Sequence, residues 1–145
     1  MSAAEVVRLA RRPEKGRAET LGELVLLESI GVEGDFAKGG DRQVSLLTAD
    51  ARKAVEAQSA RGLCFGRFVE NILVDGLNPE EMREGALLYI GGAVLQVSPS
   101  KKKCHDGCAI RLENARCPLS ECVRFAAVIE GGLVRIGDGV KVIKK

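Results

Sequence analysis

The segment from 101 to 122 concentrates the residue types that can act as nucleophiles or metal ligands. Four of the five cysteines and the only histidine of the chain lie within the nineteen residues 104–122: Cys104, His105, Cys108, Cys117 and Cys122. Lys101, Lys102 and Lys103 directly precede Cys104. A thiol reacts as the thiolate, a free cysteine titrates near pH ~8.5, and positive neighbours favour the charged form. Cys104 is therefore expected to be the most reactive thiol, beside lysines that would attract an anionic phosphate or persulfide.

Two kinds of chemistry fit this segment. The spacing Cys-x3-Cys-x8-Cys-x4-Cys, with His105 as a substitute ligand, is compatible with a structural zinc site, although such sites commonly use tighter pairs. Alternatively Cys104 acts alone, as a nucleophile or as a ligand for a soft metal centre. If the segment is helical, Cys108 lies one turn further on and could resolve a persulfide on Cys104 or form a disulfide with it.

Two further polar groups stand among apolar residues or glycines. Glu70 and Asn71 interrupt an apolar run, so they either face solvent or line a polar pocket with their hydrogen bonds satisfied. Asp35 and Arg42 flank a glycine-containing segment that is either a plain turn or an anion site. In the second case backbone amides would approach the anion and Arg42 would grip it with two hydrogen bonds.

The elements that position these residues are mostly short predicted strands separated by glycines. One helix is expected from an N-cap at Thr48 to a stop at Gly62, and a turn or short helical entry at 78–81. Two hairpins are expected, 87–97 around Gly91-Gly92 and 123–136 around Gly131-Gly132. The remaining strands are expected at 6–9, 24–30, 44–47, 68–74 and 140–143, and 31–40 is expected to be loop. This spacing predicts a mainly β fold, a closed or nearly closed antiparallel barrel with one or two short helices.

Composition limits the class of protein. The 145 residues suit a single domain spanning 1–145, and a net charge of +2 with 3% aromatic residues argues against nucleic-acid binding. No apolar run approaches the ~20 residues of a membrane span, and the N-terminus does not resemble a signal peptide. We therefore expect a cytoplasmic protein without membrane partners, in which the thiols stay reduced.

Three segments in order give the chain a family resemblance. Gly31-Val32-Glu33-Gly34-Asp35, then 42–47 (RQVSLL), then 66–72 (GRFVENI) resemble the MOSC domain, named for the molybdenum cofactor sulfurase C-terminus. Gly85, the 90–93 turn and a late cysteine at Cys104 follow in the family's order. The resemblance covers residues 15–143 and is strongest to short stand-alone bacterial members. The chain departs from many relatives at Ala37, where they carry a histidine.

The resemblance implies roles for these residues. Cys104 would carry sulfur as a persulfide or ligate molybdenum, with Cys108 and His105 assisting. Arg42 and Lys103 would hold the phosphate of a molybdopterin, and Asp35, Glu70 and Asn71 would line its pocket. A cysteine desulfurase or another donor would supply sulfur, and molybdopterin or a molybdoenzyme would accept it. A catalytic member would be a sulfurtransferase or a molybdenum-dependent reductase of N-hydroxylated compounds; the alternative is a non-catalytic zinc module using the four clustered cysteines.

Overall fold

The structure is a computed structural model that describes residues 4–14, 17–36, 39–40, 43–57, 70–77, 79–99 and 123–143. Its elements, in chain order, are β1 (Ala4–Glu14), β2 (Arg17–Leu21), β3 (Glu23–Leu27), β4 (Gly31–Val32), β5 (Val44–Thr48), α1 (Ala49–Ala57), β6 (Ile72–Asp75), the 3-10 helix η1 (Pro79–Glu81), β7 (Leu87–Ile90), β8 (Ala93–Val97), β9 (Arg124–Glu130), β10 (Gly132–Arg135) and β11 (Gly139–Ile143).

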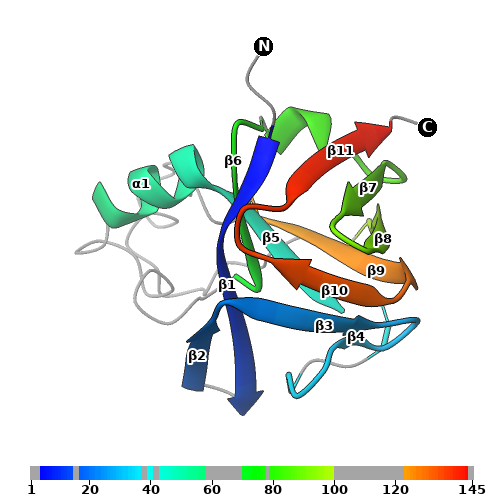
Figure 1. Ribbon diagram of the computed structural model, residues 1–145. Helices are drawn as coiled ribbons and strands as arrows, with labels where there is room; N and C mark the ends of the chain where they lie inside the picture. The colour runs from blue at the N-terminus through cyan, green and yellow to red at the C-terminus, as the bar shows by residue number, and fades with distance from the viewer. Residues whose placement is uncertain are drawn as a thin grey trace.

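The larger sheet closes on itself. Within the described ranges, seven strands follow one another in the order β1-β11-β7-β8-β9-β5-β6 and return to β1, and β2 continues from the far half of β1 (Figure 1). The long β1 makes this possible because Ala4 pairs with β11 while Leu9 pairs with both β2 and β6. The predicted mainly β, barrel-like fold is therefore confirmed.

One pair of barrel strands is parallel rather than antiparallel. Leu46 pairs with Ile72 and Thr48 pairs with Val74 in the β5–β6 ladder. Parallel neighbours need a crossover connection, and α1 begins directly after β5. The predicted N-cap is confirmed, since the Thr48 hydroxyl accepts a hydrogen bond from the Ala51 N–H at 3.3 Å. The predicted helix end at Gly62 lies outside the described residues.

The predicted hairpin around Gly131-Gly132 is wrong. β9 pairs with β8 and β5 in the barrel, whereas β10 leaves the barrel and pairs with β3 in a second sheet, β10-β3-β4. Gly131 and Gly132 allow the chain to pass from the barrel to the second sheet, because their backbone lies very close to the backbone of other segments. A Cβ on Gly131 would lie 2.6 Å from the Leu26 carbonyl oxygen, and one on Gly132 would overlap the Gly92 carbonyl.

Other predicted boundaries differ by a few residues. β1 extends beyond the expected strand at 6–9 and covers Ala4–Glu14, and Gly31 and Val32 form β4 inside the expected loop. The hairpin around Gly91-Gly92 is confirmed, as is the short helical segment after 78. Within the described ranges, no helix is long and apolar enough to cross a bilayer.

The core occupies the barrel interior, and a second buried layer lies outside β5 and β6. Alternate strand residues such as Val44, Leu46 and Ile72 point into the core cluster. Their neighbours Ser45 and Leu47 are also buried, although they belong to the opposite face of β5. α1 contacts β5 and β6 and lies outside the barrel beside them (Figure 1). Both faces of β5 are therefore buried, and its outer face carries Ser45, a member of the polar network described next.

Candidate functional site

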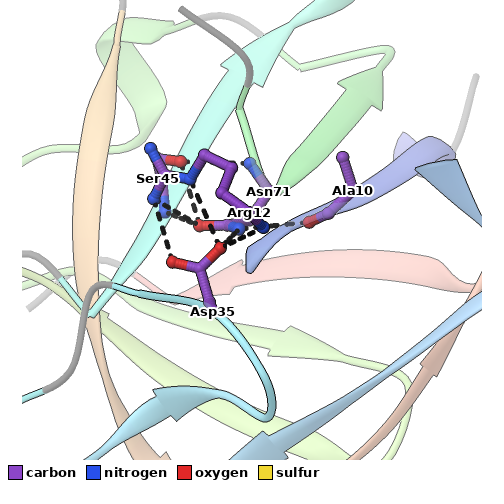
Figure 2. A network of polar contacts seen from close by, with 5 residues as sticks. All are labelled: Ala10, Arg12, Asp35, Ser45 and Asn71. Carbon is purple, nitrogen blue, oxygen red and sulfur yellow. Dashed lines mark hydrogen bonds and ion pairs between the residues drawn. The ribbon is translucent and has the colours of Figure 1, made fainter. Parts of the chain in front are cut away.

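Asn71 is the centre of a buried polar network that joins three parts of the fold (Figure 2). Its side-chain NH2 donates to the Ala10 carbonyl and to Asp35 Oδ1, both at 3.1 Å. Its side-chain oxygen accepts from the N–H and the hydroxyl of Ser45, both at 3.0 Å, and from Arg12 Nη2 at 3.4 Å. The residue has no exposed surface. Asn71 thus ties β1, β5 and the segment after β4 to the start of β6.

The carboxylate of Asp35 binds both the backbone N–H and the guanidinium of Arg12. The Arg12 N–H donates to Asp35 Oδ1 at 2.6 Å, and its guanidinium reaches both carboxylate oxygens, Nε to Oδ1 at 3.3 Å and Nη2 to Oδ2 at 3.2 Å. The Phe36 N–H donates to the Arg12 carbonyl at 2.7 Å, and the Phe36 ring lies 4.9 Å from the guanidinium carbon. This fork geometry, capped by an aromatic face, gives Arg12 one orientation.

The turn that presents Asp35 depends on Gly34. The Asp35 N–H donates to the Val32 carbonyl at 3.1 Å, which closes a four-residue turn. Gly34 has φ +84°, a conformation that favours glycine, and a Cβ there would lie 3.1 Å from the guanidinium of Arg11. The sequence therefore places an acidic residue directly after a glycine turn so that its carboxylate meets β1.

Glu70 is the second buried carboxylate of the site and lies between two arginines. Arg8 Nη2 donates to one of its oxygens at 2.7 Å, and Arg52 of α1 donates to the other. The Glu70 side chain has no exposed surface, whereas 10% of Arg52 and 39% of Arg8 is exposed. A buried carboxylate is costly unless it is paired and hydrogen-bonded, and here both oxygens are.

A β-bulge in β1 turns Arg8 toward Glu70. Val6 pairs with Val74 and Arg8 pairs with Leu73, so Val7 is an extra residue in the ladder. Val6 and Leu9 both belong to the barrel core, although three positions separate them. In a regular strand such residues would point to opposite faces. The bulge therefore lets both apolar residues point inward and leaves Arg8 on the outer face.

Described residues on either side of the cysteine-rich segment are linked to the network through Phe125. The backbone N–H and the hydroxyl of Ser98 donate to the Phe125 carbonyl at 2.8 and 3.0 Å. Phe125 is paired with Ser45, which holds Asn71. The chain thus leaves β8 and enters β9 next to the strand that carries part of the network.

The structure places three of the predicted site residues and leaves the others as predictions. Asp35 and Asn71 are in direct contact, and Glu70 is the neighbour of Asn71 in the chain; all three are buried rather than facing solvent. The remaining predicted residues lie outside the described residues: Arg42, Lys103, Cys104, His105, Cys108, Cys117 and Cys122. In the described ranges, no three His, Cys, Asp or Glu side chains are grouped to hold a metal ion.

Sequence reasoning did not identify Arg8, Arg12, Ser45 or Arg52 as members of the site. Arg8 and Arg12 lie in β1, and Arg52 lies in the first half of α1. Neither Arg12 nor Arg52 stands inside an otherwise apolar run, as Glu70 and Asn71 do. In the sequence Val7 and Leu9 fit a period of two, so the bulge that places Val6 in the core and Arg8 on the outer face is visible only in the structure. The local sequence carries no signal for Ser45 either.

Comparison with known proteins identifies a family model and several solved structures. The model of the MOSC domain matches residues 33–141. A crystal structure of a hypothetical protein superposes with a TM-score of 0.72 and 21% identity, covering 99% of this chain and 68% of that one. YuaD from Bacillus subtilis gives 0.64 and 18%, covering 97% and 96%, and YiiM from Escherichia coli gives 0.64 and 21%, covering 97% and 70%. At these identities the structures show a shared fold. No curated protein gives a significant match.

Proposed function

Because this chain belongs to the MOSC domain family, which is associated with the molybdenum cofactor, we propose that it acts in maturing molybdenum or tungsten enzymes. In this role it is a sulfur carrier or a cofactor-binding protein, with Cys104 as the residue that holds sulfur or ligates the metal. The observation that carries the proposal is the position of the buried network. Ser98 and Phe125, which flank the segment with Cys104, are hydrogen-bonded to each other, and Phe125 pairs with Ser45, which holds Asn71.

The described residues fit a phosphate-bearing pterin in charge and in hydrogen bonding. Three guanidinium groups, of Arg8, Arg12 and Arg52, face two carboxylates, of Asp35 and Glu70, so this cluster of described residues has one positive charge in excess. Arginine suits phosphate because its planar fork can donate two hydrogen bonds to one anion. Arg42 and Lys103 would add to this charge. When bound, the cofactor supplies a metal centre that accepts sulfur ligands.

The sulfur-carrying step needs no additional oxidant. The Cys104 thiolate attacks the outer sulfur of a persulfide on a cysteine desulfurase or a similar donor. A new S–S bond forms on Cys104, and the donor thiolate leaves. An acceptor can then take the outer sulfur, or the Cys108 thiolate can attack Cys104 Sγ, which forms a disulfide and releases hydrosulfide. The positive neighbours of Cys104 favour the thiolate that the first step requires.

Native mass spectrometry of protein purified without oxygen tests this proposal. We expect the wild type to gain one sulfur from a persulfide donor, or to carry a bound pterin. Cys104→Ser should abolish sulfur loading at this position. Cys117→Ser is the matched control from the same segment, and it should keep most of the loading.

Two outcomes would contradict the sulfur-carrier proposal. In the first, sulfur loading is the same in Cys104→Ser and in the wild type. In the second, the wild type gains no sulfur and retains a stoichiometric metal that Cys117→Ser loses, which would favour a structural zinc module. A Cys104-centred carrier does not depend on Cys117, so the two variants separate the alternatives.

A further inference from the structure

Arg8 differs from the other two arginines of the site in how much of it reaches solvent. Its side chain is 39% exposed, against 15% for Arg12 and 10% for Arg52. Among the described residues, its guanidinium has one hydrogen-bond acceptor, Glu70 Oε1 at 2.7 Å. A guanidinium has five N–H donors, so the described residues leave most of the donors of Arg8 for a ligand.

Glu70 holds Arg8 in place and shares its second oxygen with Arg52. Both oxygens of Glu70 are engaged, one by each arginine. Arg8 is the more exposed of the two arginines, so it is the one that can present its positive charge to a ligand. A preoriented arginine loses less side-chain entropy on binding an anion than a freely rotating one does.

The bulge in β1 supports the same conclusion independently. Val7 has no partner residue in the β1–β6 ladder, so the regular pairing of the two strands is interrupted there. Its consequence is that Arg8 lies on the outer face while Val6 and Leu9 remain in the core. Bulges are common next to functional sites, where they redirect one side chain.

We propose that Arg8 is an anion-binding residue that takes the phosphate group of a phosphomonoester ligand, with Glu70 and Arg52 as positioning residues. The inference rests on the proposed function only in taking that ligand to be a pterin phosphate. The phosphate binds by charge-assisted hydrogen bonds from the donors of Arg8 that Glu70 does not use.

The test is isothermal titration of the full chain with inorganic phosphate, at constant ionic strength maintained with chloride. We expect the wild type to bind phosphate and Arg8→Gln to bind it about tenfold more weakly or worse, because a charge-assisted pair is lost. Arg8→Lys keeps the charge but not the fork and should be intermediate. Arg17→Gln is the matched control, since Arg17 lies on the surface and, among the described residues, forms a long 3.9 Å pair with Glu14.

The proposal is overturned if the wild type does not bind phosphate or if Arg8→Gln binds it as tightly as the wild type. It is also overturned if Arg17→Gln loses as much affinity as Arg8→Gln does. Should Arg8→Gln fail to fold, the phosphate affinity of Arg8→Lys is compared with that of the wild type. An unchanged affinity in Arg8→Lys would overturn the binding of phosphate by the guanidinium of Arg8. Cys104→Ser should bind phosphate normally while losing sulfur loading, so failure here is distinct from failure of the sulfur-carrier proposal.

Discussion

At the scale of single residues, the site is built from two buried carboxylates in different settings. Asp35 is tied to one arginine and to the amide of Asn71, so it acts as a fixed point for Arg12. Glu70 is shared between two arginines that come from different elements, β1 and α1. Removing the charge of Glu70 would leave two guanidinium groups facing each other across a buried position, and this arrangement is unfavourable.

We therefore expect Glu70→Gln to lower the free energy of unfolding by about 2–3 kcal/mol, somewhat less than for a wholly buried pair because Arg8 is partly exposed. Glu23→Gln is the matched control. Glu23 also pairs with an arginine, Arg135 at 3.3 Å, but both side chains are more than half exposed. Its effect should stay below about 0.5 kcal/mol. Urea denaturation measures both, and equal effects would show that burial of Glu70 does not matter.

At the scale of elements, α1 brings Arg52 to the site, and its first turn depends on Thr48. The Thr48 hydroxyl accepts the hydrogen bond from the Ala51 N–H, which directly precedes Arg52 in the chain. The same residue is the last of β5 and pairs with Val74 of β6. One side chain thus joins the end of a barrel strand to the start of the helix that reaches Glu70.

Replacing Thr48 by Val, which preserves the volume and removes the hydroxyl, should lower the free energy of unfolding by about 1–2 kcal/mol. Thr48→Ser keeps the hydroxyl and loses one methyl group, so its cost should be about 0.8 kcal/mol or less. Amide hydrogen exchange at Ala51 separates the two effects. Faster exchange in the Val variant and unchanged exchange in the Ser variant is the expected result; the reverse order would contradict the cap.

At the scale of the whole molecule, the chain between β9 and β10 joins the barrel to the smaller sheet. β10 pairs with β3 through four residue pairs, from Gly132–Leu26 to Arg135–Glu23. The backbone of Gly132 lies against that of Gly92, in the turn between β7 and β8. At Gly92 and Gly132 the two sheets therefore meet through main-chain contacts that leave no room for a side chain on Gly132.

Gly132→Ala should consequently destabilise the protein by about 2 kcal/mol or more, because the new methyl group overlaps the Gly92 carbonyl and a rigid backbone must move. Gly139→Ala is the matched control, since a Cβ at Gly139 has no neighbour within 4 Å. That change should stay within about 0.5 kcal/mol. Thermal unfolding compares the two variants, and a Gly132→Ala protein as stable as Gly139→Ala would refute the close approach of the sheets.

Much of this protein follows from the sequence alone, because those features depend on neighbours in the chain. Alternating apolar residues predict most of the strands, Thr48 predicts the start of α1, and Gly91-Gly92 predicts the β7–β8 hairpin. The ordered segments around Asp35, 42–47 and 66–72 were enough to identify the family. Glu70 and Asn71 were also found, since polar residues inside an apolar run are conspicuous.

Only the tertiary structure decided how these pieces meet. The parallel β5–β6 pair, the transfer of β10 to the second sheet and the bulge at Val7 all depend on contacts between residues far apart in the chain. The same holds for the arginines, whose partners lie from 18 to 62 positions away. Local patterns record which face of a strand is apolar, but they do not record which strand lies beside it or which carboxylate an arginine reaches.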